Sequence, residues 1–207
     1  HPSQKQKEEA IERLPYLKDS SFVTVMNDKR IETSYAFLRT PIYYGTFNSG
    51  KIITNQQRHG LGLIWIQGVG AVFQSQSESD DASWGTRAID SLQAYEASDL
   101  MPRTMLHQME TDQPFKASTV SYKLAGNGEK IITFDRGNIK VEINHSGAFS
   151  EILPVLIFDD DLISVNSGQI QIETPEGPVL IKSTEKDGIT LKDVETDLEN
   201  KKCKVIE

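Results

Sequence analysis

Aromatic, histidine and arginine side chains gather in one segment of this chain, between Tyr43 and Arg87. Rings of this kind can stack on the apolar face of a sugar, while arginine and histidine can bond its polar groups. A histidine also titrates near neutral pH and is suited to proton transfer. The segment therefore predicts a binding site for a polysaccharide or oligosaccharide, formed by Tyr43, Tyr44, Arg58, His59, Trp84 and Arg87.

Several of these aromatic and histidine residues also have a purely structural interpretation. Trp65 stands in the apolar run Leu61–Ile66, so we expect it to pack in the core between two sheets. Trp84 follows a polar loop and fits a core position and a surface position equally well. His59 precedes Gly60 at the start of a strand, where a structural hydrogen bond is the commoner role. No residue is therefore assigned to catalysis, and His59 is the one candidate for it.

Other familiar sites are missing or are better explained as turns. Gly68-Val69-Gly70 lacks the third glycine and the following helix of a dinucleotide-binding loop. Asp159-Asp160-Asp161 lacks the ligand spacing of an EF-hand, which favours a solvated turn. With one cysteine and four scattered histidines, the sequence offers no zinc site of ordinary spacing. We expect no metal and no cofactor.

Short strands separated by turns must position these side chains. Apolar and polar residues alternate over short runs, and turn residues recur roughly every 8–12 positions. A turn is expected at Asn48-Ser49-Gly50, and Ile89–Gln108 reads as a loop with room for one helical turn. The pattern predicts an all-β fold, an antiparallel β-sandwich. The expected strands are 22–26, 30–38, 42–47, 51–54, 61–66, 71–73, 119–124, 130–134, 139–144, 150–158, 162–165, 169–173, 179–182 and 189–192.

The N-terminal residues differ from the rest of the chain. Gln4–Leu14 are helix formers with few apolar positions, and Pro15 ends the run. We predict a short helical linker from an upstream domain over residues 1–18, followed by one β-sandwich domain over residues 19–207.

Charge and hydropathy exclude two classes of partner. The formal net charge of -8 argues against a nucleic-acid surface, because phosphate binding needs a concentrated cationic face. No apolar run approaches the length of about 18 residues that a membrane-spanning helix needs. We expect no nucleic-acid partner and no membrane span.

The central hairpin resembles the C-terminal β-sandwich region of the heparinase II/III-like polysaccharide lyases. His59 matches the first histidine of the family's His-x-His signature, whereas Leu61 replaces the second. The likeness rests on His59-Gly60-Leu61-Gly62-Leu63, on Ile64–Gly68, and on the later runs Glu151–Leu156, Asp161–Ile163 and Gln169–Glu173.

In that family an α-toroid precedes the β-domain, and an anionic polysaccharide binds in the cleft between them. The resemblance implies a lyase-type supersandwich, an upstream α-toroid domain as partner, and a secreted or periplasmic location. It also implies β-elimination on a uronate polysaccharide, to which this β-domain contributes a binding cleft without being active alone. Two other functions remain open: a non-catalytic carbohydrate-binding or structural β-sandwich, and an interaction module that docks a partner protein.

Overall fold

The computed structural model describes residues 3–13, 19–51, 59–75, 82–91, 93–111, 113–158, 161–166, 168–174, 177–184, 189–194 and 201–206. Its strands pair antiparallel throughout these residues. The prediction of an all-β, sandwich-like fold is therefore confirmed.

The elements begin and end as follows: α1 (Gln4–Arg13), β1 (Phe22–Asp28), β2 (Thr33–Arg39), β3 (Tyr43–Lys51), β4 (Gly60–Ile66), β5 (Gly70–Gln74), β6 (Gly85–Ala88), β7 (Asp99–Leu100), β8 (Ser118–Leu124), the 3-10 turn η2 (Ala125–Asn127), β9 (Gly128–Phe134), β10 (Ile139–Asn144), β11 (Phe149–Phe158), β12 (Leu162–Asn166), β13 (Gln169–Glu173), β14 (Val179–Lys182), β15 (Leu191–Val194) and β16 (Lys201–Ile206).

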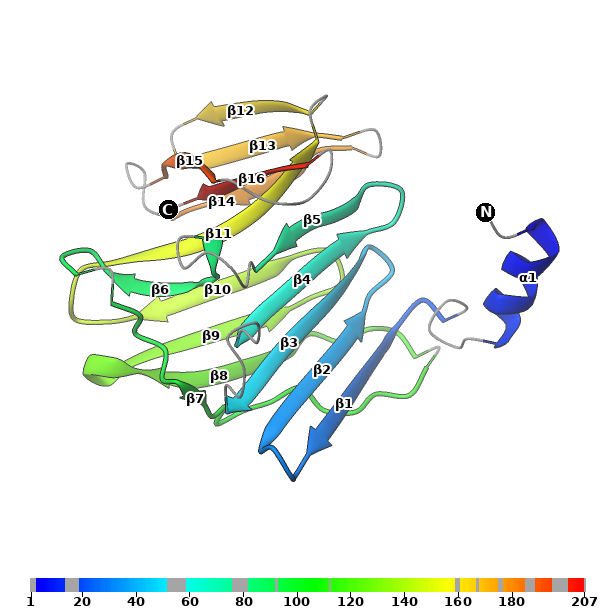
Figure 1. Ribbon diagram of the computed structural model, residues 1–207, viewed down its shortest axis with the longest axis horizontal. Coiled ribbons are helices and arrows are strands. Elements are labelled where there is room, and N and C mark those ends of the chain that lie inside the picture. The colour runs from blue at the N-terminus through cyan, green and yellow to red at the C-terminus, as the bar shows by residue number, and fades with distance from the viewer. Residues whose placement is uncertain are drawn as a thin grey trace.

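The strands form one large sheet and two small ones (Figure 1). The large sheet has the order β1-β2-β3-β4-β5-β11-β16-β15, with β6 paired to β11 and β7 paired to β3. The sheet β10-β9-β8 lies behind β1–β5, and the sheet β12-β13-β14 lies near β15 and β16. Strand β11 is long enough to run past both small sheets, so it joins the two parts of the molecule.

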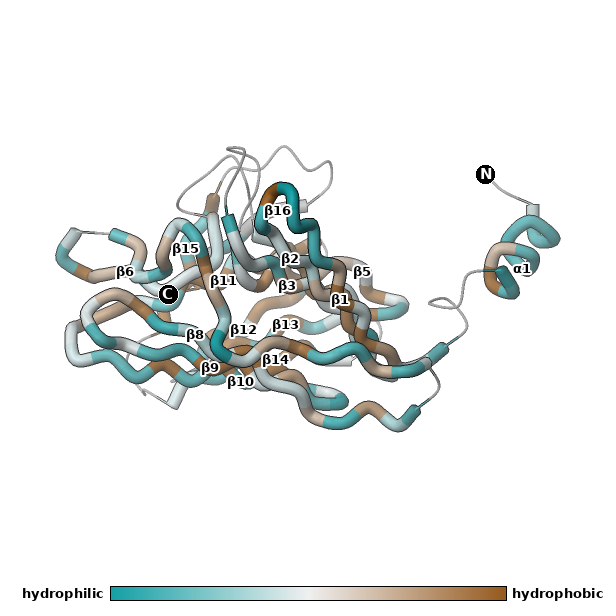
Figure 2. The backbone as a smooth tube through the Cα atoms, turned by 90° about the horizontal axis from the view of Figure 1, so that it is seen from below, coloured by the Kyte–Doolittle hydropathy of each residue, from teal (hydrophilic) through white to brown (hydrophobic). Residues whose placement is uncertain are grey.

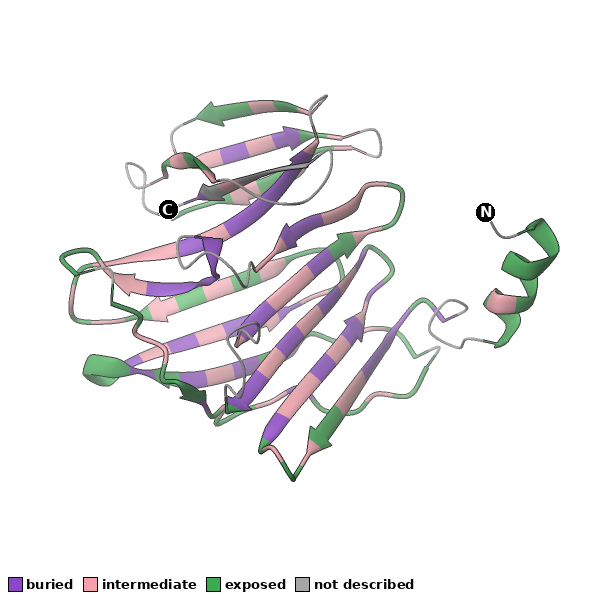
Figure 3. Ribbon diagram, in the orientation of Figure 1, coloured by how far each residue is buried: buried purple, intermediate pink, exposed green. Residues whose placement is uncertain are grey.

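The main core lies between β1–β5 and the sheet β10-β9-β8. Apolar side chains alternate along these strands, so one face of each sheet is buried, as the banding in Figure 3 shows. Phe47, Leu38, Val120, Ile132 and Phe134 are completely buried there. A second core forms between β11, β13 and β16, around Val155, Ile157, Ile170, Ile172 and Ile206.

The N-terminal helix was predicted correctly and contributes nothing to either core. α1 has no buried residue, and it lies outside the sandwich beyond β1 in two perpendicular views (Figures 1 and 2). In the part of the chain that is described, no helix is long and apolar enough to cross a membrane. The division into residues 1–18 and 19–207 stays a prediction.

One predicted turn is wrong. Strand β3 continues through Asn48-Ser49-Gly50, because this segment is held by β2 on one side, where Thr33 lies opposite Gly50. Pairing with a neighbouring strand thus overrides the local turn preference of these residues. Gly50 has a φ of 95°, and a Cβ atom there would overlap the carbonyl oxygen of Glu32. The glycine marks a close backbone approach instead of a hairpin.

Three strands were missed by the pattern analysis. β6, β7 and β16 are short or polar, and they form because β11 and β3 offer them unpaired backbone groups. No helical turn forms in the described residues of the loop Ile89–Gln108, where β7 lies instead. The expected strand 51–54 falls almost entirely outside the described residues.

Candidate functional site

A row of aromatic side chains, with one arginine among them, crosses the large sheet on the face that points away from the main core. Phe22 on β1 lies opposite Arg39 on β2, Arg39 lies opposite Tyr44 on β3, and Tyr44 lies opposite Trp65 on β4. Paired residues in neighbouring antiparallel strands point to the same face, so these four side chains share one surface. Since strands lie about 4.8 Å apart, the row extends roughly 14 Å across the sheet.

This row forms the floor of a groove with a volume of about 580 Å³. The rings of Phe22 and Tyr44 approach to 6.4 Å between centroids, with their planes inclined at 57°. Trp65 keeps 39% of its surface exposed, and Met26 and Ile42 at the sides are 58% and 50% exposed. Apolar surface this open, gathered in one hollow, is typical of a binding site.

Polar groups stand among the rings of the groove. Arg39 brings a guanidinium group into the row, and Gln67 and Thr111 bring an amide and a hydroxyl to its edge. Thr24 and Phe37 occupy the adjacent row of the same sheet face. Exposed ring faces next to hydroxyl, amide and guanidinium groups can bind a ligand that has both apolar faces and polar edges.

The sequence placed Tyr43 and Tyr44 in one site, but the structure turns them to opposite faces of β3. Tyr44 lies in the open row, while the ring of Tyr43 is buried in the main core. The Tyr43 hydroxyl donates a hydrogen bond to the carbonyl oxygen of Asp135 at 2.8 Å, and burial raises its pKa well above the usual value. Tyr43 thus ties the two layers of the sandwich together at the end of the groove.

The prediction that Trp65 packs in the core is wrong, and Trp84, for which the sequence favoured neither environment, is the buried tryptophan. Trp65 lies in the groove instead of the core, because β4 pairs with β3 so that Ile64 points inward. Trp84 is 7% exposed and packs its ring edge against Phe47, with 6.5 Å between centroids. The residues of β4 form a continuous apolar run in the sequence, so the sequence does not indicate which of its two faces is buried.

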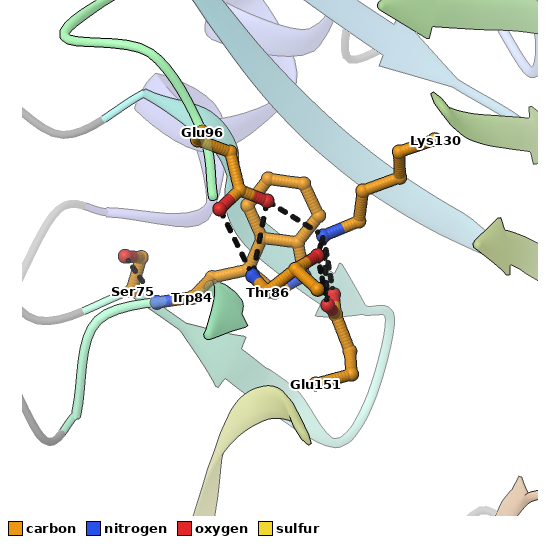
Figure 4. Close-up of polar contacts among 6 residues, drawn as sticks. All are labelled: Ser75, Trp84, Thr86, Glu96, Lys130 and Glu151. Atoms are coloured by element: carbon orange, nitrogen blue, oxygen red, sulfur yellow. Dashed lines mark hydrogen bonds and ion pairs between the residues drawn. The ribbon is translucent and has the colours of Figure 1, made fainter. Parts of the chain in front are cut away.

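Trp84 covers a buried cluster of charged residues (Figure 4). The amine of Lys130 lies 3.8 Å from the centroid of the Trp84 ring, and the lysine side chain is completely buried. Lys130 Nζ is 3.0 Å from Glu96 Oε1 and 2.7 Å from Glu151 Oε1. It also donates a hydrogen bond to the hydroxyl of Thr86 at 2.9 Å. A cation in the core is thus paired with two carboxylates and a ring face.

Four separate segments position this cluster. Lys130 stands on the buried face of β9, in line with Ile132 and Phe134. Glu151 comes from β11, and Glu96 comes from the segment between β6 and β7. The backbone N–H of Thr86 donates to both oxygens of Glu96 at 3.0 Å, which fixes this carboxylate in place.

The Glu151 carboxyl of this cluster has a raised pKa. Burial raises its pKa, the positive charge of Lys130 lowers it in part, and the negative charge of Glu96 raises it again. The Thr86 hydroxyl accepts a hydrogen bond from Lys130 and donates one to Glu151 Oε2 at 2.8 Å, so it links the lysine to this carboxyl. This site was not identified from the sequence. The signal that could have indicated it is a lysine two residues before Ile132 and four before Phe134, on the strand face that those apolar residues bury.

His59 directly precedes β4 and is not among the residues that line the groove. Its Nε2 atom is buried and has no hydrogen-bond partner among the described residues, and the same holds for Trp84 Nε1. Burial lowers the pKa of His59, and a hydrogen bond with the Gly50 backbone and the charges of Asp99 and Glu96 oppose this shift. His59 is therefore half-buried within the influence of Asp99 and Glu96, and it does not line the groove.

The two arginines of the predicted site are placed differently. Arg87 is on β6, opposite Ser150 of β11, and is partly exposed. Arg58 lies outside the described residues. Of the six predicted site residues, the groove thus contains Tyr44, with Tyr43 at its end. Their roles in binding stay predictions.

Comparisons with known proteins and a metal search add no further assignment. No family model matches the chain, and searches among curated proteins and solved structures found no match. Within the described residues, no group of three or more His, Cys, Asp or Glu side chains is placed to hold a metal ion.

Proposed function

We propose that this chain is a non-catalytic carbohydrate-binding β-sandwich, whose groove binds a polysaccharide or oligosaccharide along the row Phe22, Tyr44 and Trp65. The observation that supports this function is the row itself, in which the partly exposed rings of Tyr44 and Trp65 share one face with Arg39, while the buried ring of Phe22 packs beside Tyr44. A sugar ring offers apolar C–H faces to aromatic side chains and hydroxyl groups to polar ones. A row of roughly 14 Å suits several linked sugar units better than one.

Binding is proposed instead of the lyase reaction that the resemblance implies. The polar groups that line the groove in the described residues are hydroxyl, amide and guanidinium groups. The histidine that matched the lyase signature, His59, is not among the residues that line the groove. Arg39 suits a carboxylate, which keeps an acidic, uronate-containing polysaccharide within the proposed ligand class. A secreted or periplasmic protein would meet such polymers.

Calorimetric titration with neutral and with uronic oligosaccharides tests the proposal. Trp65→Ala and Tyr44→Ala are each expected to weaken binding about tenfold or more, because each removes a stacking surface. Ile89→Ala is the matched control, since Ile89 is an exposed apolar residue that is not part of the groove lining, and its affinity should not change. Arg39→Ala separates the ligand classes: a selective loss of uronic oligosaccharides identifies an acidic ligand.

Two results would overturn the proposal. One is the absence of binding to either class of sugar, or binding that Trp65→Ala and Tyr44→Ala leave unchanged. The other is a mass well above 23.2 kDa in light scattering that Trp65→Ala returns to the monomer value, because the groove would then be a protein-docking surface.

A further inference from the structure

The buried Lys130 cluster is not used by the proposed groove. Its amine is shielded from water, held between two carboxylates, and covered by an aromatic ring. Burying charges is costly, and an apolar core of the same shape would often be as stable. One cation with two buried acids also leaves an excess of negative charge, unless one acid takes up a proton. The cluster therefore calls for a chemical explanation beyond an ordinary ion pair.

We propose that Lys130 and Glu151 join spontaneously in an intramolecular amide (isopeptide) bond, with Glu96 as the proton carrier. The amine lies 2.7 and 2.8 Å from the two oxygens of the Glu151 carboxyl, in direct contact with the group it would attack. Such fixed proximity replaces a collision in solution and can accelerate the reaction by several orders of magnitude when the groups are well oriented. The exclusion of water prevents competing solvation of the amine and the acid.

The reaction balances with the groups present in the cluster. Lys130 gives one ammonium proton to the Glu96 carboxylate, at 3.0 Å, and becomes a neutral nucleophile. The amine attacks Cδ of Glu151 in its protonated form, the form that its raised pKa favours. The Thr86 hydroxyl, which donates to Oε2, stabilises the tetrahedral oxyanion. One C–N bond forms, one C–O bond breaks, one water leaves, and Glu96 keeps the proton.

The bond would connect the two layers of the sandwich. Lys130 belongs to β9 in the small sheet, and Glu151 belongs to β11, which runs through the large one. A covalent link between them would constrain the unfolded chain in the way a disulfide does, although the chain has a single cysteine. The Trp84 ring, which covers the Lys130 amine, would shield the amide from water.

The intact mass of the folded, then denatured, protein tests this proposal. We expect a mass about 18 Da below that of the sequence, because one water is lost per amide formed. After digestion with trypsin, residues 124–136 should stay uncut at Lys130 and be joined to residues 141–182 through Glu151.

Variants of the three reacting residues sharpen the result. Lys130→Arg should have its full sequence mass, because guanidinium is not a nucleophile at neutral pH. Glu96→Gln should keep most of the protein unlinked, whereas Glu151→Gln should form the same amide with loss of ammonia, about 17 Da. Lys140 and Glu142 are the matched internal control, since they pair at 2.8 Å with both side chains more than half exposed, and no link should form there.

A wild-type mass equal to that of the sequence would overturn the proposal, even if Lys130→Arg fails to fold. A lower mass with the link mapped to any other pair would overturn it as well. Full linkage in a folded Glu96→Gln variant would remove Glu96 from the reaction. None of these results depends on whether the groove binds a sugar.

Discussion

Single residues in this sandwich derive their roles from the face of the strand on which they stand. Tyr43 and Tyr44 are neighbours in the sequence, yet one bonds the opposite layer and the other lines the groove. Lys130 stands on the same buried face of β9 as Ile132 and Phe134, and this placement alone brings a charge into the core. A residue's type shows what chemistry it can perform, and its strand face decides whether it meets a ligand or the interior.

His59 should make the stability of the protein depend on pH. Burial lowers its pKa below the ordinary value of about 6.5, so the folded state keeps it neutral while the unfolded state takes up a proton first. The resulting stability is present above that ordinary value and is lost as the pH falls toward the lower pKa of the folded state. Urea unfolding should show this loss as the pH falls through the ordinary value of about 6.5.

The variant His59→Gln should lack this part of the pH dependence, and the exposed His107→Gln should retain it. The comparison is the difference in unfolding free energy between each variant and the wild type at each pH. Parallel curves for His59→Gln and the wild type would show that His59 does not titrate differently on folding.

At the scale of strands, alternation identified most of the elements but not the contacts between them. The run Ile139–Asn144 and the run Gln169–Glu173 were recognisable because their apolar residues recur at every second position. The face that Trp65 occupies depends on the register between β3 and β4, which includes a bulge and has no local sequence signal. The groove and the Lys130 cluster therefore could not be assembled from the sequence, since each collects residues from several strands.

The start of β4 depends on a glycine at position 60. Gly60 has a φ of 78°, and a Cβ atom there would overlap the Trp84 ring. We expect Gly60→Ala to lower the unfolding free energy by about 2–4 kcal/mol, from backbone strain and displacement of the ring together. Gly177→Ala is the control, because Gly177 also has a positive φ, of 116°, with nothing within 4 Å of the added atom.

The difference between these two variants isolates the contact with Trp84. Denaturant unfolding of both proteins measures it, and tryptophan fluorescence should shift for Gly60→Ala alone. Equal losses in the two variants would mean that backbone strain explains the whole effect, and that the Trp84 ring can move aside.

At the scale of the molecule, two cores share one strand. β11 contributes Val155 and Ile157 to the core that it forms with β13 and β16, while Leu153 of the same strand packs against both cores. Val179 of β14 also contacts both. Side chains that bridge two clusters couple their unfolding, so we expect the large sheet and the small sheet β12-β13-β14 to unfold together.

The variant Ile170→Ala tests this coupling. Ile170 is completely buried in the second core, and its truncation should lower the unfolding free energy by about 2–5 kcal/mol. Trp65 and Trp84 are the only tryptophans of the chain and lie in the other part, so their fluorescence reports the main sandwich. Coupled cores require that the fluorescence transition and the far-ultraviolet circular dichroism transition both shift by the same amount.

Leu162→Ala, at a 73% exposed position on the neighbouring strand β12, should move neither transition. The fluorescence transition of Ile170→Ala could instead stay at its wild-type midpoint while the dichroism transition splits in two. The small sheet β12-β13-β14 would then unfold by itself, and β11 would not couple its unfolding to that of the large sheet.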